Sequence, residues 1–152
     1  MSIVKDFRFP VDVEVVEGRL TRAMVAGKPP LDVATPPEFK GGIPGVWSPE
    51  DLLVAAAASC YAVTLVAVAE RSRLALRGLD VHGVGHVMRR GDGTVGFVAV
   101  ELHAAFETDE ESEGKARRLA RKAKDVCIVT LALDVPVHLT LDVRTAALEP
   151  VV

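Results

Sequence analysis

The chain has 152 residues, about one domain's worth, of which 49% are hydrophobic and 26% charged, so it can form a core without disulfides or a structural metal. The net charge of −3 and the pI near 5.8 give no reason to expect nucleic acid as a partner. The first residues lack the apolar stretch of a signal peptide, so we expect one cytoplasmic domain over residues 1–152 with both cysteines reduced at rest. The absence of Asn and Gln fits either a thermophile or a GC-rich genome.

Two segments precede the most apolar part of the chain. In residues 11–26, valines alternate with acidic side chains and a second apolar run follows Gly18, a pattern that predicts a β-hairpin. Residues 27–47 contain two Pro-Pro pairs and a Gly-Gly pair, which exclude a helix and leave at most a short strand near residues 31–33. Because ordered loops of this length usually have a role, this segment is a candidate wall of an active site.

The segment over residues 48–73 has the clearest helix start. Ser48 can cap the helix, Pro49 suits its first position, and Asp51 can complete a capping box. Between residues 52 and 69, only two small hydroxyl side chains and one cysteine interrupt the apolar run, so the predicted central helix needs burial all round. The run is Ala-rich and barely long enough for a membrane span, so we expect it to lie in a protein core.

Three further elements follow the central helix. Alternating apolar residues predict a second hairpin over residues 79–106, with the turn RRGDGT inside it. Residues 109–127 predict a second helix, because acidic residues fill its first turn, basic residues its later turns, and its apolar stripe ends at Cys127. Residues 136–144 alternate again and predict a last, half-exposed strand.

The order of these elements predicts the fold class. Two hairpins, two helices and a last strand without regular strand–helix alternation favour an α+β fold with a largely antiparallel sheet. In one small domain, a sheet with one open face cannot bury all sides of a helix that is apolar all round. We therefore expect a second subunit to cover the helix in an obligate homodimer.

The histidines and the basic helix predict no separate site. Gly83 and Gly85 indicate that His82 and His86 lie on a strand, where this spacing separates them by roughly 13 Å, so we expect no shared metal and no cofactor. The basic cluster over residues 115–124 is more typical of a solvated helix face than of a phosphate site.

The two cysteines have two interpretations. Unpaired cysteine is among the most buried residue types, so Cys60 and Cys127 could be small core side chains. Each also belongs to the core-facing part of a different predicted helix, so the two can meet. A cytosolic pair within disulfide range is typical of a peroxidatic and a resolving thiol, and the residues alone leave both interpretations open.

The run SPEDLLVAAAASCYAVTL resembles the OsmC/Ohr family, the osmotically inducible protein C and organic hydroperoxide resistance proteins. The match includes Pro49, Glu50, Leu52 and Cys60. A second matching stretch is KAKDVCIVTLALDVPVHLTLDV, where a late helix ends in a cysteine and a strand follows. The resemblance extends over residues 41–143 and covers most of the chain.

This resemblance implies an OsmC-like α+β fold, an intertwined homodimer in which largely antiparallel sheets wrap around buried central helices. It implies Cys60 as the peroxidatic thiol, Cys127 as the resolving thiol, and Glu50 as the partner of an arginine that lowers the pKa of Cys60. The family usually has proline directly after its second cysteine, whereas this chain has Ile128. The implied chemistry needs an external dithiol as reductant and no cofactor.

The activating cation stays open between three residues. One branch of the family has its arginine in the N-terminal hairpin, which favours Arg19 and then Arg22, while another has it before the central helix, where this chain offers Lys40. On a straight helix, Glu50 and Cys60 would lie roughly 15 Å apart. Either the helix is broken between them or a long arginine bridges the gap.

The sequence therefore leads to two functional hypotheses. The first is a thiol-dependent peroxidase that reduces organic, fatty or aromatic hydroperoxides to alcohols, with Trp47 and Tyr61 in an apolar substrate pocket. The alternative is a non-catalytic redox sensor or small-molecule binding module on the same fold.

Overall fold

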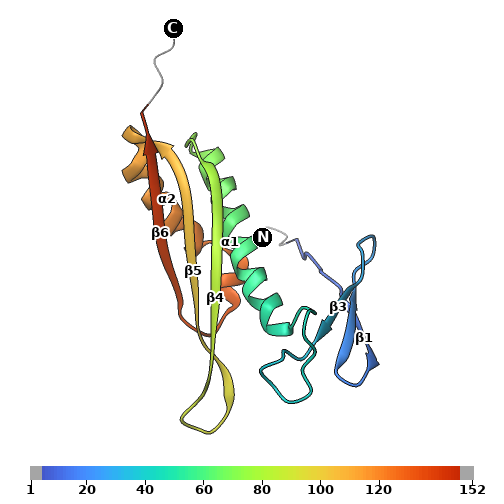
Figure 1. The fold of residues 1–152 in the computed structure, drawn as a ribbon. Helices are drawn as coiled ribbons and strands as arrows, with labels where there is room; N and C mark the ends of the chain where they lie inside the picture. The colour runs from blue at the N-terminus through green and yellow to red at the C-terminus, as the bar shows by residue number, and fades with distance from the viewer. Residues whose placement is uncertain (1–4, 148–152) are drawn as a thin grey trace. The chain divides into compact units, whose positions relative to one another are not determined.

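The computed structural model describes residues 5–147, which divide into two compact units after Leu52 (Figure 1). We call them the first unit, up to Leu52, and the second unit, from Leu53 onward. That the chain acts as a single domain stays a prediction.

The first unit contains a three-stranded antiparallel sheet in the order β1-β2-β3. Its strands are β1 (Asp12–Glu17), β2 (Leu20–Met24) and β3 (Leu31–Ala34), so β1 and β2 form the hairpin expected from the alternating valines. The hairpin turns at Gly18, whose φ of +54° is a conformation that glycine adopts without a steric penalty.

The segment between β3 and the central helix is irregular but tied together by backbone hydrogen bonds. The N–H of Ile43 donates to the carbonyl of Thr35 at 3.0 Å, and the N–H of Ala34 donates to the carbonyl of Trp47 at 2.8 Å. A Cβ at Gly42 would lie 2.1 Å from the carbonyl oxygen of Pro36, so only glycine fits there. The loop is therefore ordered, as its length suggested.

The central helix is α1 (Pro49–Arg71), and it begins with the predicted capping box. The hydroxyl of Ser48 accepts from the N–H of Asp51 at 3.0 Å, while the Asp51 carboxylate accepts from the N–H of Ser48 at 2.9 Å. The helix is continuous to Arg71. A break between Glu50 and Cys60, one of the two options left by the sequence, is therefore excluded.

The second unit has a sheet in the order β4-β5-β6, drawn side by side in Figure 1. The strands are β4 (Arg77–Arg89), β5 (Val95–Asp109) and β6 (Val137–Ala146). Strands β4 and β5 form the second hairpin and are antiparallel, whereas β6 pairs with β5 in parallel. This pairing is possible because a long helical connection joins β5 to β6. The predicted α+β class with largely antiparallel sheets is confirmed.

The second helix differs from the single helix expected over residues 109–127. A 3₁₀ turn, η1 (Glu110–Ser112), precedes α2 (Glu113–Asp125), and a separate short helix, α3 (Ile128–Ala132), follows. The hydroxyl of Thr130 donates to the carbonyl of Lys124 at 2.8 Å, which satisfies a carbonyl at the end of α2 and stops the helix there. Cys127 therefore lies in extended conformation between two helices.

The core of the second unit lies on one face of its sheet. Alternate β5 residues face it, and α1 and α2 pack there with them. The main core residues are Ala57, Tyr61, Leu65, Ala69, Val100, Leu102, Ala104, Phe106, Ala116, Ala120 and Ala123. The opposite face of the sheet is exposed, and it carries the histidines of β4 and β5.

Helix α1 buries one stripe and leaves another uncovered within the chain. By length and composition it could cross a membrane, with a mean hydropathy of 2.2, but Tyr61 and Leu65 are fully buried in the core of the second unit. On its other side, the side chains of Val63 and Val66 are 65% and 40% exposed. The helix is therefore a core helix that is only partly covered by its own chain.

Candidate active site

The structure brings together the two cysteines. Cys60 lies in the middle of α1 and is partly exposed, whereas Cys127 directly precedes α3 and is fully buried. Both are free thiols, and their side chains lie close enough to interact. Their proximity follows from the packing of α1 and of the segment after α2 on the same face of the sheet.

The surroundings of Cys127 favour its thiolate. Burial alone would raise the pKa of Cys127, but backbone and side-chain interactions with Thr130, the Cys60 thiol and the N–H of Val129 together lower it below its ordinary value. Although Cys127 is the N-cap residue of α3, its side chain makes no capping hydrogen bond. These groups therefore stabilise the thiolate form of Cys127 relative to its neutral thiol.

Sequence reasoning missed Thr130 as part of this site. Its side chain is 8% exposed, and its hydroxyl donates to the carbonyls of Lys124 and Cys127 at 2.8 and 3.1 Å. The sequence offered only its position three residues after Cys127, about one helical turn away.

Tyr61 holds α1 against α2 next to Cys60. Its side chain is fully buried, and its hydroxyl donates to the carbonyl of Ala120 at 3.1 Å. Burial, and to a smaller degree nearby Cys127, raise the pKa of Tyr61, so the phenol stays neutral. Its role as a lining of a substrate pocket stays a prediction, and so does that of Trp47, whose side chain is 49% exposed in the first unit.

Glu50 lies in the first turn of α1 and has an unsatisfied carboxylate oxygen. Its Oε2 atom is buried and has no hydrogen-bond partner among residues 5–147. A buried polar atom without a partner is rare in folded proteins. Because α1 is continuous, Glu50 and Cys60 lie roughly 15 Å apart along the helix axis, so they do not touch directly.

Two of the three candidate cations have partners in the first unit, and the third, Lys40, is exposed. Arg19 packs over Gly41 and donates one N–H to the carbonyl of Lys40, which leaves further donors of its guanidinium for another acceptor. Arg22 forms an exposed ion pair with Asp32 on the neighbouring strand, with Nε 2.8 Å from Oδ1. This pairing raises the pKa of Arg22 and lowers that of Asp32. The choice of Arg19 as the activating cation stays a prediction.

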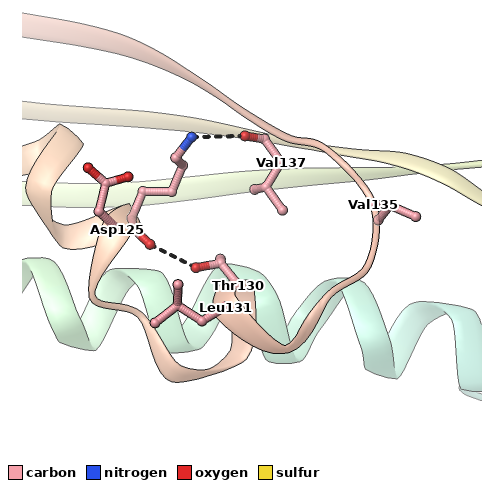
Figure 2. A pocket seen from close by; sticks show the side chains of 6 residues that line it. Asp125, Thr130, Leu131, Val135 and Val137 are labelled. Carbon is pink, nitrogen blue, oxygen red and sulfur yellow. Dashed lines mark hydrogen bonds between the residues drawn. The ribbon is translucent and has the colours of Figure 1, made fainter.

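A pocket lies beside the turn that carries Cys127 (Figure 2). It has a volume of about 180 Å³ and is lined by Lys124, Asp125, Thr130, Leu131, Val135 and Val137. The Lys124 ammonium donates to the carbonyl of Val137 at 3.2 Å across one side of it. Neither cysteine lines this pocket, so it is separate from the thiol pair.

The histidines are distributed over the open face of the second sheet. His82 lies opposite His103 across β4 and β5, and Nε2 of His86 lies 3.0 Å from a carboxylate oxygen of Glu101. Within the part of the chain that the structure describes, no three His, Cys, Asp or Glu side chains are grouped to hold a metal ion.

Comparison with known proteins decides the family. The model of the OsmC-like protein family matches residues 42–142. The chain belongs to the OsmC-like family. YmaD of Bacillus subtilis, an uncharacterized protein, is 29% identical over 113 residues, 72% of this chain and 75% of that protein. The family match over residues 42–142 includes both cysteines and Glu50, whereas Arg19, Arg22 and Lys40 lie before it.

Solved structures show the fold of this OsmC-like chain. An OsmC-like protein of unknown function from Vibrio cholerae superposes with a TM-score of 0.81 at 14% identity, over 90% of this chain and 99% of that one. An organic hydroperoxide resistance protein OsmC from Legionella pneumophila gives a TM-score of 0.71 at 24% identity, over 91% of this chain and 99% of that one. At these identities, the likeness establishes a common architecture.

Proposed function

We propose that this OsmC-like protein is a thiol-dependent peroxidase that reduces organic hydroperoxides to alcohols. The observation that carries the proposal is the meeting of Cys60, which is partly exposed, with Cys127, which is buried. The peroxide has to reach the sulfur of Cys60, and the sulfur of Cys127 has to reach Cys60 to form the disulfide. The likeness to the Legionella protein, named for organic hydroperoxide resistance, supports the same substrate class.

The proposed reaction proceeds in three steps. The Cys60 thiolate attacks the terminal oxygen of the hydroperoxide, the O–O bond breaks, and the alkoxide leaves as an alcohol after taking a proton. Cys127 then attacks the Cys60 sulfenic acid, which forms a disulfide and releases water. An external dithiol returns two electrons and restores both thiols.

We assign the activation of Cys60 to Arg19 and Glu50. A thiol ionises near neutral pH when a cation lies close to it, and a carboxylate can orient that cation. The partnerless Oε2 atom of Glu50 supports this role because it needs a donor. Since Glu50 does not reach Cys60 along its own helix, the arginine spans the gap or a second subunit supplies the pair.

The working form in this proposal is an intertwined homodimer. Apolar side chains on two elements are exposed in the single chain, Val13 and Val15 on β1 and Val63 and Val66 on α1. Exposed apolar surface of this kind is typical of subunit interfaces. A cytoplasmic location belongs to the same proposal, because a reducing compartment resets the thiols after each turnover.

The second candidate function is a redox sensor or small-molecule binding module without turnover. The pocket beside Cys127 favours it, because this pocket offers a charged rim at Lys124 and Asp125 but contains neither sulfur. A ligand in this pocket would contact Thr130, the neighbour of Cys127, and would couple binding to the state of the thiol.

A steady-state assay with cumene hydroperoxide and dihydrolipoamide tests the peroxidase. We expect turnover by the native protein, none by Cys60→Ser, and a single turnover by Cys127→Ser, which would stop at the sulfenic acid. Intact-mass analysis after brief peroxide treatment should show the loss of two hydrogen atoms, as a Cys60–Cys127 disulfide requires. Rapid disulfide formation without turnover would favour the sensor, and turnover that survives Cys60→Ser would refute the assignment of the peroxidatic thiol.

A further inference from the structure

The two cysteine residues differ in their access to solvent in the single chain. Cys127 has a relative exposure of 0% and belongs to the core cluster, whereas Cys60 is partly exposed on α1. In thiol–disulfide exchange, the attacking thiolate reaches one sulfur while the other sulfur leaves, so the accessible sulfur is the one attacked. The burial of Cys127 therefore makes it a poor target for an external thiol.

The surroundings of Cys127 favour its thiolate. Donors on the backbones of Thr130 and Val129 and on the Thr130 side chain lower the pKa of Cys127, and the Thr130 hydroxyl, which donates to the Cys127 carbonyl at 3.1 Å, holds this turn in place. Such donors favour a negative charge on this sulfur. A thiol whose charge is stabilised leaves faster in exchange, so Cys127 is suited to be the sulfur that departs.

We infer that the disulfide of this protein is reduced with fixed polarity, with the external thiol bonding to Cys60 while Cys127 leaves as a thiolate positioned by Thr130. The inference rests on the proposed function and names the step that follows peroxide reduction. Thr130 is a positioning residue in this step, because it acts through Cys127 and does not touch the reductant.

The reductant thiolate gives its electron pair to Cys60, a new S–S bond forms, and the old bond breaks with its pair on Cys127. The second thiolate of the dithiol then attacks its own bonded sulfur, which frees the Cys60 thiolate and leaves the reductant as an internal disulfide. Two electrons have passed from the dithiol to the protein.

The polarity can be measured without peroxide. The disulfide is formed in the purified protein with diamide, exposed briefly to glutathione, quenched in acid and washed. The remaining thiols are then alkylated with N-ethylmaleimide under denaturing conditions and mapped by peptide mass spectrometry. We expect glutathione on Cys60 and N-ethylmaleimide on Cys127.

Two results would overturn the inference. One is glutathione on Cys127, or on both sulfurs equally, in the first adduct. The other is the failure of diamide to join Cys60 to Cys127. Because the disulfide is made chemically, a correct polarity together with no peroxidase turnover would refute the proposed function alone.

The role of Thr130 is tested with Thr130→Val, which keeps the shape and loses the hydroxyl, and Thr130→Ser, which restores it. Thr130→Val should raise the pKa of Cys127, read from thiolate absorbance in a Cys60→Ser background, and slow the attack of glutathione on the disulfide. Thr130→Ser should recover both. If Thr130→Val leaves both the titration and the rate unchanged, the positioning role is refuted.

Discussion

Gly83 on β4 is predicted to be required by the close approach of α1. A Cβ at Gly83 would lie 2.8 Å from Cγ1 of Val54, closer than carbon atoms pack, while its next neighbours, the Cβ of Ala58 and Cδ2 of Leu102, would lie at ordinary distances of 3.5 and 3.7 Å. Val54 cannot turn away easily, because a β-branched side chain in a helix has one strongly preferred rotamer. The conflict is therefore between one new methyl group and one existing methyl group.

The magnitude follows from two opposing effects. Overpacking a core position costs about 1–3 kcal/mol, while replacing glycine by alanine restricts the unfolded chain and returns about 0.4–1 kcal/mol. Gly83→Ala should therefore lower the free energy of unfolding by about 0.5–2 kcal/mol, and each kcal/mol should lower Tm by roughly 2–4 °C. Gly91→Ala is the matched control, because its Cβ would meet no atom within 4 Å.

Urea denaturation at one fixed protein concentration measures both variants, since the stability of the proposed dimer would depend on concentration. The decisive comparison repeats Gly83→Ala in a Val54→Ala background, where the conflicting methyl is gone and the cost should fall to about zero. An equal cost of Gly83→Ala in both backgrounds, or equal stability of the Gly83→Ala and Gly91→Ala proteins, would contradict the reasoning.

Four further predictions follow from the capping box, the buried phenol, the thiol pair and the proposed dimer. Ser48→Ala removes the capping acceptor of α1 and should cost about 1 kcal/mol in urea denaturation, whereas Ser48→Thr should cost less. Tyr61→Phe removes the hydroxyl donor to an α2 carbonyl and should cost about 1 kcal/mol by the same assay. Because the pKa of Cys127 is lowered in the folded chain, the contribution of this thiol to stability should rise with pH. It should be complete above the ordinary thiol pKa of about 8.5 and be lost as the pH falls through the folded pKa. Cys127→Ser should abolish this dependence in urea denaturation measured across pH. Mixed dimers of Glu50→Ala with Cys60→Ser subunits should regain peroxidase activity if the Glu50 carboxylate acts across the subunit interface. Activity no higher than that of either parent would show that Glu50 acts on Cys60 of its own chain.

The parts of the fold that depend on neighbouring residues could be predicted from the sequence. The capping box at Ser48 and Asp51 and the hairpins are formed by residues close along the chain, so their side-chain types and spacing carry the information. The break before Cys127 could not be predicted in this way. The apolar spacing of α2 continues past its last residue as far as Cys127. The helix ends earlier, where the hydroxyl of Thr130 donates a hydrogen bond to the carbonyl of Lys124.

The candidate site divides along the same line. The sequence pointed to Cys60 and Cys127 through their motifs, and the family match over residues 42–142 agrees with the resemblance that named them. It did not identify Thr130, because the contribution of this residue depends on how the turn folds back on Cys127. It also left the cation open between Arg19, Arg22 and Lys40, since a side chain's reach depends on distances that the sequence does not contain.

By itself, the sequence determined the α+β class, the apolar central helix and the two thiols, because periodicity, capping and motif spacing are local properties of the chain. Only the tertiary structure decided that β6 joins β5 in parallel, that Cys127 lies buried between two helices, and that the Glu50 carboxylate has an oxygen without a partner. Each of these depends on the packing of segments distant in sequence, which sets burial and hydrogen bonding, and these in turn control the reactivity of a thiol.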